Sequence, residues 1–238
     1  NPEKFWQNVS EDIFWFKKPT KILNKSKPPF YKWFEDGVTN TCYNAIDTHI
    51  DQGKGDKIAL IYDSPITNKK AKFTYKELRE KISKFAGALD NQGIKKGDRV
   101  IIYMPMIPEA VIAMLACGRI GAIHSVVFGG FASNELASRI DDSKAKILIT
   151  ASCGFEPGRT VEYRPLVDGA LKLAKHKVEK VIFFQREGNE VKLNSPLEIS
   201  WEESLINAKD KDCVEIGANE FAYILYTSGT TGIPKGIV

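Results

Sequence analysis

Residues 99–150 read RVIIYMPMIPEAVIAMLACGRIGAIHSVVFGGFASNELASRIDDSKAKILIT, a stretch in which strand and helix patterns alternate. Short apolar runs of strand length fall at 99–104, 122–127 and 146–150, and helical stretches follow the first two at 108–117 and 133–142. Helical crossovers join parallel strands, and strands that are apolar throughout are buried on both faces. The pattern therefore predicts an α/β fold with a mainly parallel sheet flanked by helices.

The flanking sequence extends this pattern in both directions. Upstream, two strands at 58–62 and 70–73 are expected to enclose a turn at 63–68. Thr74 and Glu77 have the spacing of a capping box, and Gly93 ends the helix that follows. Its apolar face is formed by Tyr75, Leu78, Ile82, Phe85 and Leu89. Downstream, the sequence predicts a helix near 164–175, a strand at 181–184, a surface hairpin at 187–196, a short helix capped by Ser200 and Glu203, and a final strand at 221–226.

The composition excludes several classes of partner. The 238 residues include 34 basic and 30 acidic side chains and no dense basic tract, so no nucleic-acid partner is expected. No apolar run approaches the roughly 20 residues of a membrane span, so no membrane partner is expected either. Four widely spaced cysteines, Cys42, Cys117, Cys153 and Cys213, indicate reduced thiols in an intracellular protein, cytoplasmic or mitochondrial. The acidic N-terminus is no signal peptide, and the missing initiator Met leaves an upstream leader open.

Residues 1–50 differ from the rest because they are rich in aromatic side chains and broken by Pro19, Pro28 and Pro29. We expect this N-terminal segment to pack on a main domain formed by residues 51–238 and to bury its rings there. A ligand site lined by these rings is the alternative.

The clearest binding motif lies in residues 221–238, FAYILYTSGTTGIPKGIV. Glycines let backbone amides approach an anion, hydroxyl groups add hydrogen-bond donors, and Lys235 adds a positive charge. The motif matches neither the Walker pattern nor the dinucleotide fingerprint GxGxxG. The residues alone predict a polyphosphate-binding loop, with a flexible turn between strands as the alternative.

YTSGTTGIPKG, residues 226–236, resembles the phosphate-binding signature of the AMP-forming adenylating enzymes, which include acyl-CoA synthetases, luciferases and the adenylation domains of peptide synthetases. Residues 5–19, FWQNVSEDIFWFKKP, and residues 104–150 resemble the short-chain branch, the acetyl-CoA and propionyl-CoA synthetases. Residues 153–171, CGFEPGRTVEYRPLVDGAL, are more similar to the propionyl type. The resemblance covers essentially the whole chain.

This resemblance implies a reaction in two steps. A short-chain carboxylate, propionate in preference to acetate, attacks the α-phosphate of ATP, and CoA then displaces AMP from the acyl-AMP. Neither step needs a protein nucleophile, so no catalytic residue is assigned and catalysis depends on positioning and charge neutralisation. Lys235 would neutralise phosphate charge, with Mg²⁺ accompanying the ATP. The β- and γ-phosphates would be held by Thr227, Ser228, Gly229, Thr230, Thr231 and Gly232.

The resemblance also implies a CoA site. Phe128, Gly129 and Gly130 would border the adenine of CoA, with a plain strand-to-helix turn as the alternative. In the turn Glu156, Pro157, Gly158 and Arg159, the arginine would pair with a CoA phosphate, with an exposed loop arginine as the alternative. Acetyl-type relatives have an Arg-Gly-Gly-type element here, which leaves the role of Glu156 open.

The remaining titratable side chains give no motif. His124 is expected to be a hydrogen-bonded core histidine, and His49 and His176 have no partner pattern. Asp141 and Asp142 are expected to end a helix and face solvent. No cluster has metal-ligand spacing, so no protein metal site is predicted.

By the same resemblance, the AMP-binding domain would be truncated after the phosphate loop. The adenine and acyl pocket, the aspartate that holds the ribose and the mobile C-terminal domain would all follow Val238. We therefore expect negligible ligase activity from the 238-residue chain alone. The alternative function is a non-catalytic nucleotide-binding, CoA-binding or interaction fragment.

Overall fold

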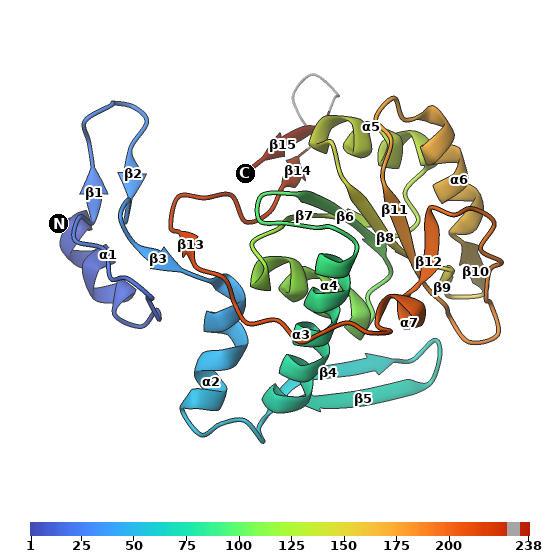
Figure 1. The fold of residues 1–238 in the computed structure, drawn as a ribbon, viewed down its shortest axis with the longest axis horizontal. Coiled ribbons are helices and arrows are strands. Elements are labelled where there is room, and N and C mark those ends of the chain that lie inside the picture. The colour runs from blue at the N-terminus through green and yellow to red at the C-terminus, as the bar shows by residue number, and fades with distance from the viewer. Residues whose placement is uncertain (228–233) are drawn as a thin grey trace.

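The computed structural model describes residues 1–227 and 234–238 (Figure 1). Its centre is a five-stranded sheet in which all neighbouring strands are parallel, in the order β12-β11-β8-β6-β7. These strands are β6 (Arg99–Met104), β7 (Ile123–Phe128), β8 (Ile147–Ala151), β11 (Lys180–Phe184) and β12 (Glu198–Ser200). The predicted α/β fold with a mainly parallel sheet is confirmed.

The helices cover both faces of this sheet. α4 (Pro108–Arg119) joins β6 to β7, α5 (Ser133–Ser143) joins β7 to β8, and α6 (Arg164–Leu173) precedes β11. Because β7 and β8 lie on opposite sides of β6, right-handed crossovers place α4 on one face and both α5 and α6 on the other. α5 packs on α6, and α4 packs on α3 (Tyr75–Asn91). Within residues 1–227 and 234–238, no helix is both long and apolar enough to cross a membrane.

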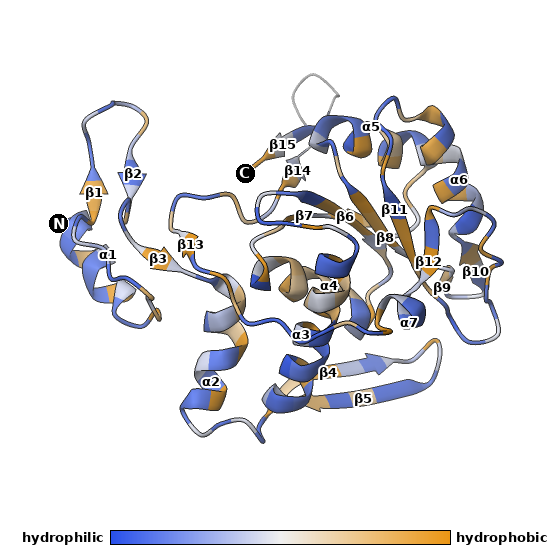
Figure 2. Cartoon of the chain, in the orientation of Figure 1, coloured by the Kyte–Doolittle hydropathy of each residue, from blue (hydrophilic) through white to orange (hydrophobic). Residues whose placement is uncertain are grey.

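The core lies between the sheet and its helices. Every residue of β8 is buried, as are the residues of β6 after Arg99. Figure 2 shows the hydrophobic residues gathered on the central strands and the hydrophilic residues on the outer faces of the helices. Strand β7 differs because its burial alternates, and the side chains of Val126 and Phe128 are 43% and 66% exposed. One face of this edge strand therefore meets solvent.

Local sequence signals predicted the flanking elements well. β4 (Ile58–Ser64) and β5 (Lys69–Thr74) form the expected antiparallel hairpin. The Thr74 hydroxyl accepts a hydrogen bond from the Glu77 amide, and the Glu77 carboxylate accepts one from the Thr74 amide, so the capping box at α3 is confirmed. The same box forms at Ser200 and Glu203 of α7 (Trp201–Ser204).

A hairpin that the sequence analysis did not predict follows β8. β9 (Cys153–Glu156) pairs antiparallel with β10 (Arg159–Glu162), and only Pro157 and Gly158 lie between the two strands. Gly158 has φ +74, a left-handed conformation in which a Cβ atom is strained. The hairpin therefore depends on glycine at this position.

Two sequence predictions are wrong in this part of the molecule. Residues 187–196 are no hairpin, because they contain no strand and form an irregular connection between the parallel strands β11 and β12. The final strand is shorter than predicted: β14 (Leu225–Thr227) pairs antiparallel with β15 (Lys235–Ile237), and Tyr223 makes only an isolated parallel bridge to His124. His124 exchanges hydrogen bonds with the Ala222 carbonyl and the Ile224 amide at this bridge, so residues 222–224 run beside β7 without forming a strand.

The N-terminal residues form small elements: α1 (Pro2–Ser10), β1 (Leu23–Asn24), β2 (Lys32–Trp33), β3 (Val38–Thr39), the π-helix η1 (Tyr43–Asp47) and α2 (Thr48–Asp51). β3 pairs with β13 (Ile216–Gly217), whereas α1 and the β1–β2 pair project from the body (Figure 1). The expected burial of the aromatic rings is wrong for several of them. The side chains of Phe5 and Phe30 are 59% and 81% exposed, and Trp6 packs on Trp33 with ring centroids 6.1 Å apart. These rings contact one another because the projecting elements place them away from the sheet.

Candidate functional site

A groove of about 320 Å³ opens at the carboxyl ends of the parallel strands. Met104 ends β6, Phe128 ends β7, Gly154 follows β8 and Arg186 follows β11, and all four line the groove. The turn of the β4–β5 hairpin contributes residues 65–67. Doubly wound sheets bind ligands at this edge, next to the strand where the direction of winding reverses. In this chain that strand is β6.

Phe128 and Gly129 line one wall of the groove, whereas Gly130, the third residue of this turn, is not among the lining residues. The Phe128 side chain is 66% exposed, so it presents an apolar ring to a ligand. A Cβ atom at Gly129 would lie 2.2 Å from the Tyr163 hydroxyl oxygen and 2.8 Å from the Met104 carbonyl oxygen. No side chain fits at these distances, so glycine at 129 is required for the close packing of this wall.

A buried tyrosine holds the same turn in place. The Tyr103 hydroxyl donates a hydrogen bond to the Phe131 carbonyl at 2.7 Å and accepts one from the Gly130 amide at 3.1 Å. Burial raises the pKa of Tyr103 to about 12, so the hydroxyl keeps its proton at neutral pH. Gly130 has φ +98, a conformation that favours glycine. The two glycines of the turn are therefore needed for different reasons.

The turn of the β9–β10 hairpin lies near the other wall. Glu156 lines the groove together with Phe128 and Gly129, whereas Pro157, Gly158 and Arg159 are not among the lining residues. The Arg159 guanidinium binds the Glu156 carboxylate, with an Nη2–Oε2 distance of 2.6 Å. The geometry thus brings together two segments that the sequence singled out separately. The ion pair with Glu156 also means that Arg159 already has a partner within its own turn.

Two groove residues were missed by the sequence analysis. Tyr163 is buried against Gly129 and Gly154, and burial raises the pKa of its hydroxyl. Arg186 lines this groove and also a wider groove of about 910 Å³ between the β4–β5 hairpin and the end of β11. Arg186 lies in no motif, and Tyr163 lies within residues 153–171, where the resemblance assigns it no role. Only the Pro157-Gly158 pair, which is typical of a tight turn, could have indicated a hairpin here.

The structure describes only the two ends of the predicted phosphate loop. Thr227 and Lys235 face each other in the β14–β15 register, and both are exposed. Ser228, Gly229, Thr230, Thr231 and Gly232 lie outside the described residues. The Tyr226 hydroxyl donates a hydrogen bond to the Asp142 carboxylate of α5 at 2.7 Å. This contact anchors the start of the loop on the helix that follows the Phe128-Gly129-Gly130 turn.

Comparison with protein families explains why these segments occur together. The family model described as AMP-binding enzyme matches residues 47–238. The chain belongs to the AMP-binding enzyme family. A second family model, described as acetyl-coenzyme A synthetase N-terminus, matches residues 1–45 of this AMP-binding enzyme chain.

Individual relatives of this AMP-binding enzyme chain match along its whole length. The chain is 56% identical over 239 residues to human acyl-CoA synthetase short-chain family member 3, mitochondrial, covering 100% of this chain and 35% of the relative. It is 45% identical over 235 residues to acetyl-coenzyme A synthetase from Streptomyces avermitilis, covering 98% and 36%. The solved acetoacetyl-CoA synthetase from Streptomyces lividans superposes with a TM-score of 0.87 at 25% identity, covering 99% and 36%. The chain thus spans about a third of the length of these relatives.

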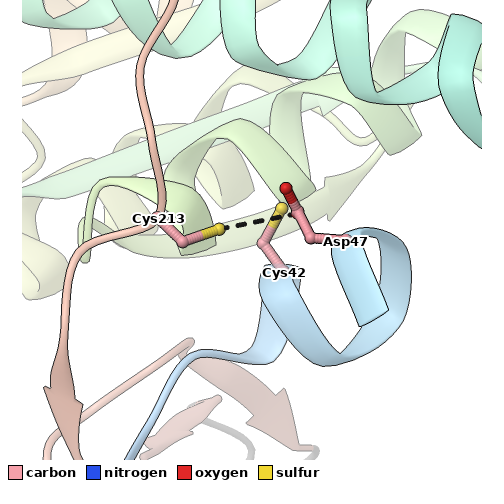
Figure 3. A group of neighbouring side chains, drawn as sticks. All are labelled: Cys42, Asp47 and Cys213. Carbon is pink, nitrogen blue, oxygen red and sulfur yellow. Dashed lines mark hydrogen bonds between the residues drawn. The ribbon is translucent and has the colours of Figure 1, made fainter. Parts of the chain in front are cut away.

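A second polar site of the AMP-binding enzyme chain joins residues far apart in the sequence. One ligand atom from each of Cys42, Asp47 and Cys213 lies within 4.8 Å of the others (Figure 3). No spacing in the sequence indicates this cluster. However, Nη1 of Arg119 donates to Asp47 Oδ2 at 2.8 Å, to Cys213 Sγ at 3.2 Å and to Cys42 Sγ at 3.6 Å. The guanidinium already supplies the positive charge at this position, so the cluster fits a buried ion pair better than a metal cage.

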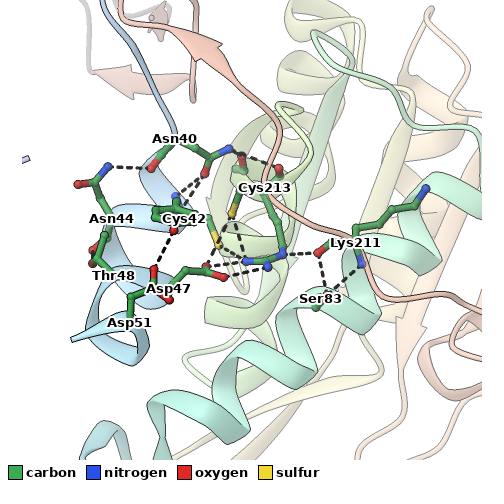
Figure 4. A network of polar contacts seen from close by, with 12 residues as sticks. Asn40, Cys42, Asn44, Asp47, Thr48, Asp51, Ser83, Lys211 and Cys213 are labelled. Carbon is green, nitrogen blue, oxygen red and sulfur yellow. Dashed lines mark hydrogen bonds and ion pairs between the residues drawn. The ribbon is translucent and has the colours of Figure 1, made fainter. Parts of the chain in front are cut away.

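Figure 4 shows how this ion pair extends into a network. Asn40 donates to the Val214 carbonyl at 2.8 Å and accepts from the Cys42 amide at 2.8 Å, while Nε of Arg119 donates to the Lys211 carbonyl at 2.5 Å. The neighbouring Cys213 side chain, followed by the Arg119 guanidinium, lowers the pKa of Cys42. The network connects residues 40–47 to the end of α4 and to residues 211–214. Its position away from the groove gives it a structural role.

His124 of β7 differs from its prediction as a hydrogen-bonded core histidine. Its Nδ1 atom is buried and has no hydrogen-bond partner among the residues that the structure describes. Burial lowers the pKa of His124 to about 4, so the ring is neutral at pH 7. The ring packs against Tyr223, with centroids 5.8 Å apart. His124 is therefore a neutral polar group at the edge of the sheet.

Asp141 and Asp142 lie in the last turn of α5, as expected, but they do more than face solvent. Asp141 accepts a hydrogen bond from the His176 amide at 2.7 Å, and Asp142 accepts the one from Tyr226. Both carboxylates therefore connect α5 to other segments.

Proposed function

We propose that this chain is the N-terminal part of an AMP-forming short-chain acyl-CoA synthetase. The reaction would convert a short-chain carboxylate, ATP and CoA to acyl-CoA, AMP and diphosphate through an acyl-AMP intermediate. The observation that carries this proposal is the meeting of the Phe128-Gly129 turn and Glu156 in one groove at the carboxyl edge of the sheet. Relatives that carry acyl-CoA and acetyl-coenzyme A synthetase in their names match the chain from end to end.

The groove fits the adenine end of CoA in size and chemistry. Its 320 Å³ lie at the lower end of the range of small-molecule sites, which suits a purine better than a whole coenzyme. Phe128 offers an apolar face, and the glycine wall allows a flat ring to approach the backbone. We propose Phe128, Gly129 and Gly130 as the adenine border and Glu156, Pro157, Gly158 and Arg159 as the nearby turn of the CoA site.

The ATP site is proposed at the β14–β15 hairpin. Thr227, Ser228, Gly229, Thr230, Thr231 and Gly232 would bind the β- and γ-phosphates through hydroxyl and amide donors, and Lys235 would neutralise their charge. Thr227 and Lys235 lie opposite each other and are both exposed, so one ligand could contact both side chains. Mg²⁺ would bind together with the ATP phosphates and supply further charge neutralisation there. The domain boundary near residue 50 and an intracellular location, cytoplasmic or mitochondrial, belong to the same proposal.

The first test assays the full-length protein with propionate or acetate, ATP and CoA, and identifies the nucleotide product. We expect carboxylate-dependent release of AMP and diphosphate, faster with propionate, and acyl-CoA only when CoA is present. Without CoA, carboxylate-dependent exchange of labelled diphosphate into ATP should continue, because acyl-AMP formation precedes thiol attack. Release of ADP and phosphate, or no dependence on a carboxylate, would contradict the proposal.

The second test separates the enzyme from a non-catalytic binding module. Calorimetric titration of the full-length protein with CoA and with ATP measures binding alone, and the acyl-CoA assay measures turnover. Binding of both ligands without turnover of acetate, propionate or butyrate would favour the binding module. For the 238-residue chain we expect negligible ligase activity, and robust acyl-CoA formation by it would contradict that expectation.

A further inference from the structure

Arg186 has an unusual environment for an arginine in the groove. It follows β11 and is half-buried, and its guanidinium carbon lies 4.7 Å from the centroid of the Phe155 ring. Phe155 belongs to β9 and lines the same groove. The Arg186 amide donates a hydrogen bond to the Ser152 hydroxyl at 2.8 Å, which fixes the backbone where the side chain begins. Stacking on Phe155 holds the guanidinium plane without using its N–H donors.

The other cations lining the two grooves or beside them have carboxylate partners. Each pairs with an acidic neighbour, as follows: Arg159 with Glu156 at 2.6 Å, Lys69 with Glu187 at 2.6 Å and Lys70 with Asp63 at 2.9 Å. Within residues 1–227 and 234–238, the Arg186 guanidinium makes no hydrogen bond or ion pair. Glu109 also lines the wider groove, but burial raises its pKa and no ion pair joins it to Arg186. Arg186 is therefore the groove cation whose donors remain available.

A half-buried arginine without a partner favours an anion whose oxygens can accept two parallel hydrogen bonds from its guanidinium. Partial burial removes some of the water around the guanidinium, and two phosphate oxygens would replace that water by accepting two parallel hydrogen bonds. Arg159 suits this role less well, because it is more exposed and a phosphate must compete with Glu156 for it. The negative charge of Glu156 would also repel a phosphate at that turn.

We propose that Arg186 is the residue that binds a phosphate of CoA in this groove, in place of Arg159. This inference rests on the proposed function, because it takes CoA as the ligand. Phe128 and Gly129 would border the adenine, and Arg186, which lines the same groove, would bind a phosphate of the same nucleotide. The phosphate is either the 3′-phosphate or the diphosphate, and the two are separable by experiment.

The test compares Arg186→Gln with Arg159→Gln in the full-length protein, by calorimetric titration with CoA, 3′-dephospho-CoA and ATP. Loss of a bidentate charged hydrogen bond predicts that Arg186→Gln weakens CoA binding about 10- to 100-fold. Arg159→Gln should change it less than about threefold. ATP affinity should stay within twofold in both variants, which also shows that each variant is folded. Arg186→Lys keeps the positive charge but cannot donate two parallel hydrogen bonds. Its CoA affinity should therefore lie between those of wild type and Arg186→Gln.

Dephospho-CoA identifies the phosphate. If Arg186 binds the 3′-phosphate, Arg186→Gln should bind CoA and dephospho-CoA with equal affinity. If Arg186 binds the diphosphate, the affinity of the variant should decrease by the same factor for both ligands. Either result supports the inference. CoA affinity within twofold of wild type in Arg186→Gln, or a loss confined to Arg159→Gln, overturns it. If wild type binds no CoA at all, the proposed function fails first, and that outcome is distinguishable because it precedes any comparison of variants.

Discussion

Asp47→Asn is expected to destabilise the protein strongly, because it removes the counter-charge of a buried arginine. The side chains of Arg119 and Asp47 are 3% and 9% exposed. Two hydrogen bonds join them, Nη1 to Oδ2 at 2.8 Å and Nη2 to Oδ1 at 3.0 Å. An asparagine can accept only one of these, and its amide group would face a guanidinium donor. Removing one partner of a buried pair costs about 3–5 kcal/mol, since the remaining charge stays buried and uncompensated.

The assay is thermal unfolding of the full-length wild type and variant, followed by tryptophan fluorescence and calorimetry. For a unit of 238 residues, each kcal/mol corresponds to a shift in melting temperature of about 2 °C. The expected decrease is therefore about 6–10 °C. The network reaches residues 40–47 and 211–214, so the transition should also show earlier exposure of Cys42, measured by thiol labelling.

The matched control is Glu11→Gln, which removes an ion pair of similar length at the surface. Lys18 and Glu11 are 2.7 Å apart, but their side chains are 68% and 61% exposed. Such pairs contribute about 0–1 kcal/mol, so this variant should melt within about 2 °C of wild type. A decrease below 2 °C for Asp47→Asn, no larger than for the control, would refute the view that burial makes the Arg119–Asp47 pair sensitive.

Two further predictions concern the sheet and the groove. Because burial lowers the pKa of His124 from 6.5 to about 4, the unfolded chain takes up its proton first as the pH falls. The contribution of neutral His124 to the free energy of unfolding is therefore fully present above pH 6.5. It decreases by about 3 kcal/mol as the pH falls towards 4. Urea unfolding at pH 7 and pH 4.5 should show a larger loss for wild type than for His124→Gln, and equal losses would contradict the assignment. Gly129→Ala should lower the free energy of unfolding by about 1–3 kcal/mol, because its Cβ atom overpacks against the Tyr163 hydroxyl, and should weaken CoA binding about tenfold, because relieving this contact displaces the groove wall. Gly188→Asn, at an open position with φ +75, is the control and should leave CoA affinity unchanged.

The sequence predicted those features that depend on neighbours along the chain. The capping boxes at Thr74 and Ser200 need only a hydroxyl and a carboxylate three residues apart. The strands β6 and β8 are recognisable because continuous apolar runs of their length suit a sheet that is covered on both faces. Local pattern and global fold agree in these elements, so short-range reasoning is sufficient for them.

The failures concern contacts between distant residues. Cys42 and Cys213 share the Arg119 guanidinium, although 171 positions separate them, and no local spacing indicates their meeting. Arg186 looks like any charged residue after a strand, and only the register of β11 beside β8 brings it to the groove. The aromatic residues near the N-terminus were misjudged for a related reason. Hydrophobicity predicts that rings are buried, but it does not say against what.

The two proposed ligand sites share a physical connection through α5. Arg139 of this helix lies between two rings, with its guanidinium carbon 5.3 Å from the centroid of Phe131 and 5.1 Å from that of Tyr226. Phe131 closes the turn that begins at Phe128, and Tyr226 opens the hairpin that leads into the glycine loop. Arg139 is also held by Glu135 at 2.8 Å, so the helix fixes the position of its guanidinium. Because one buried side chain packs against both segments, a shift of either turn would change the packing of the other. The sheet sets where each segment leaves its strand, and α5 sets the relation between them.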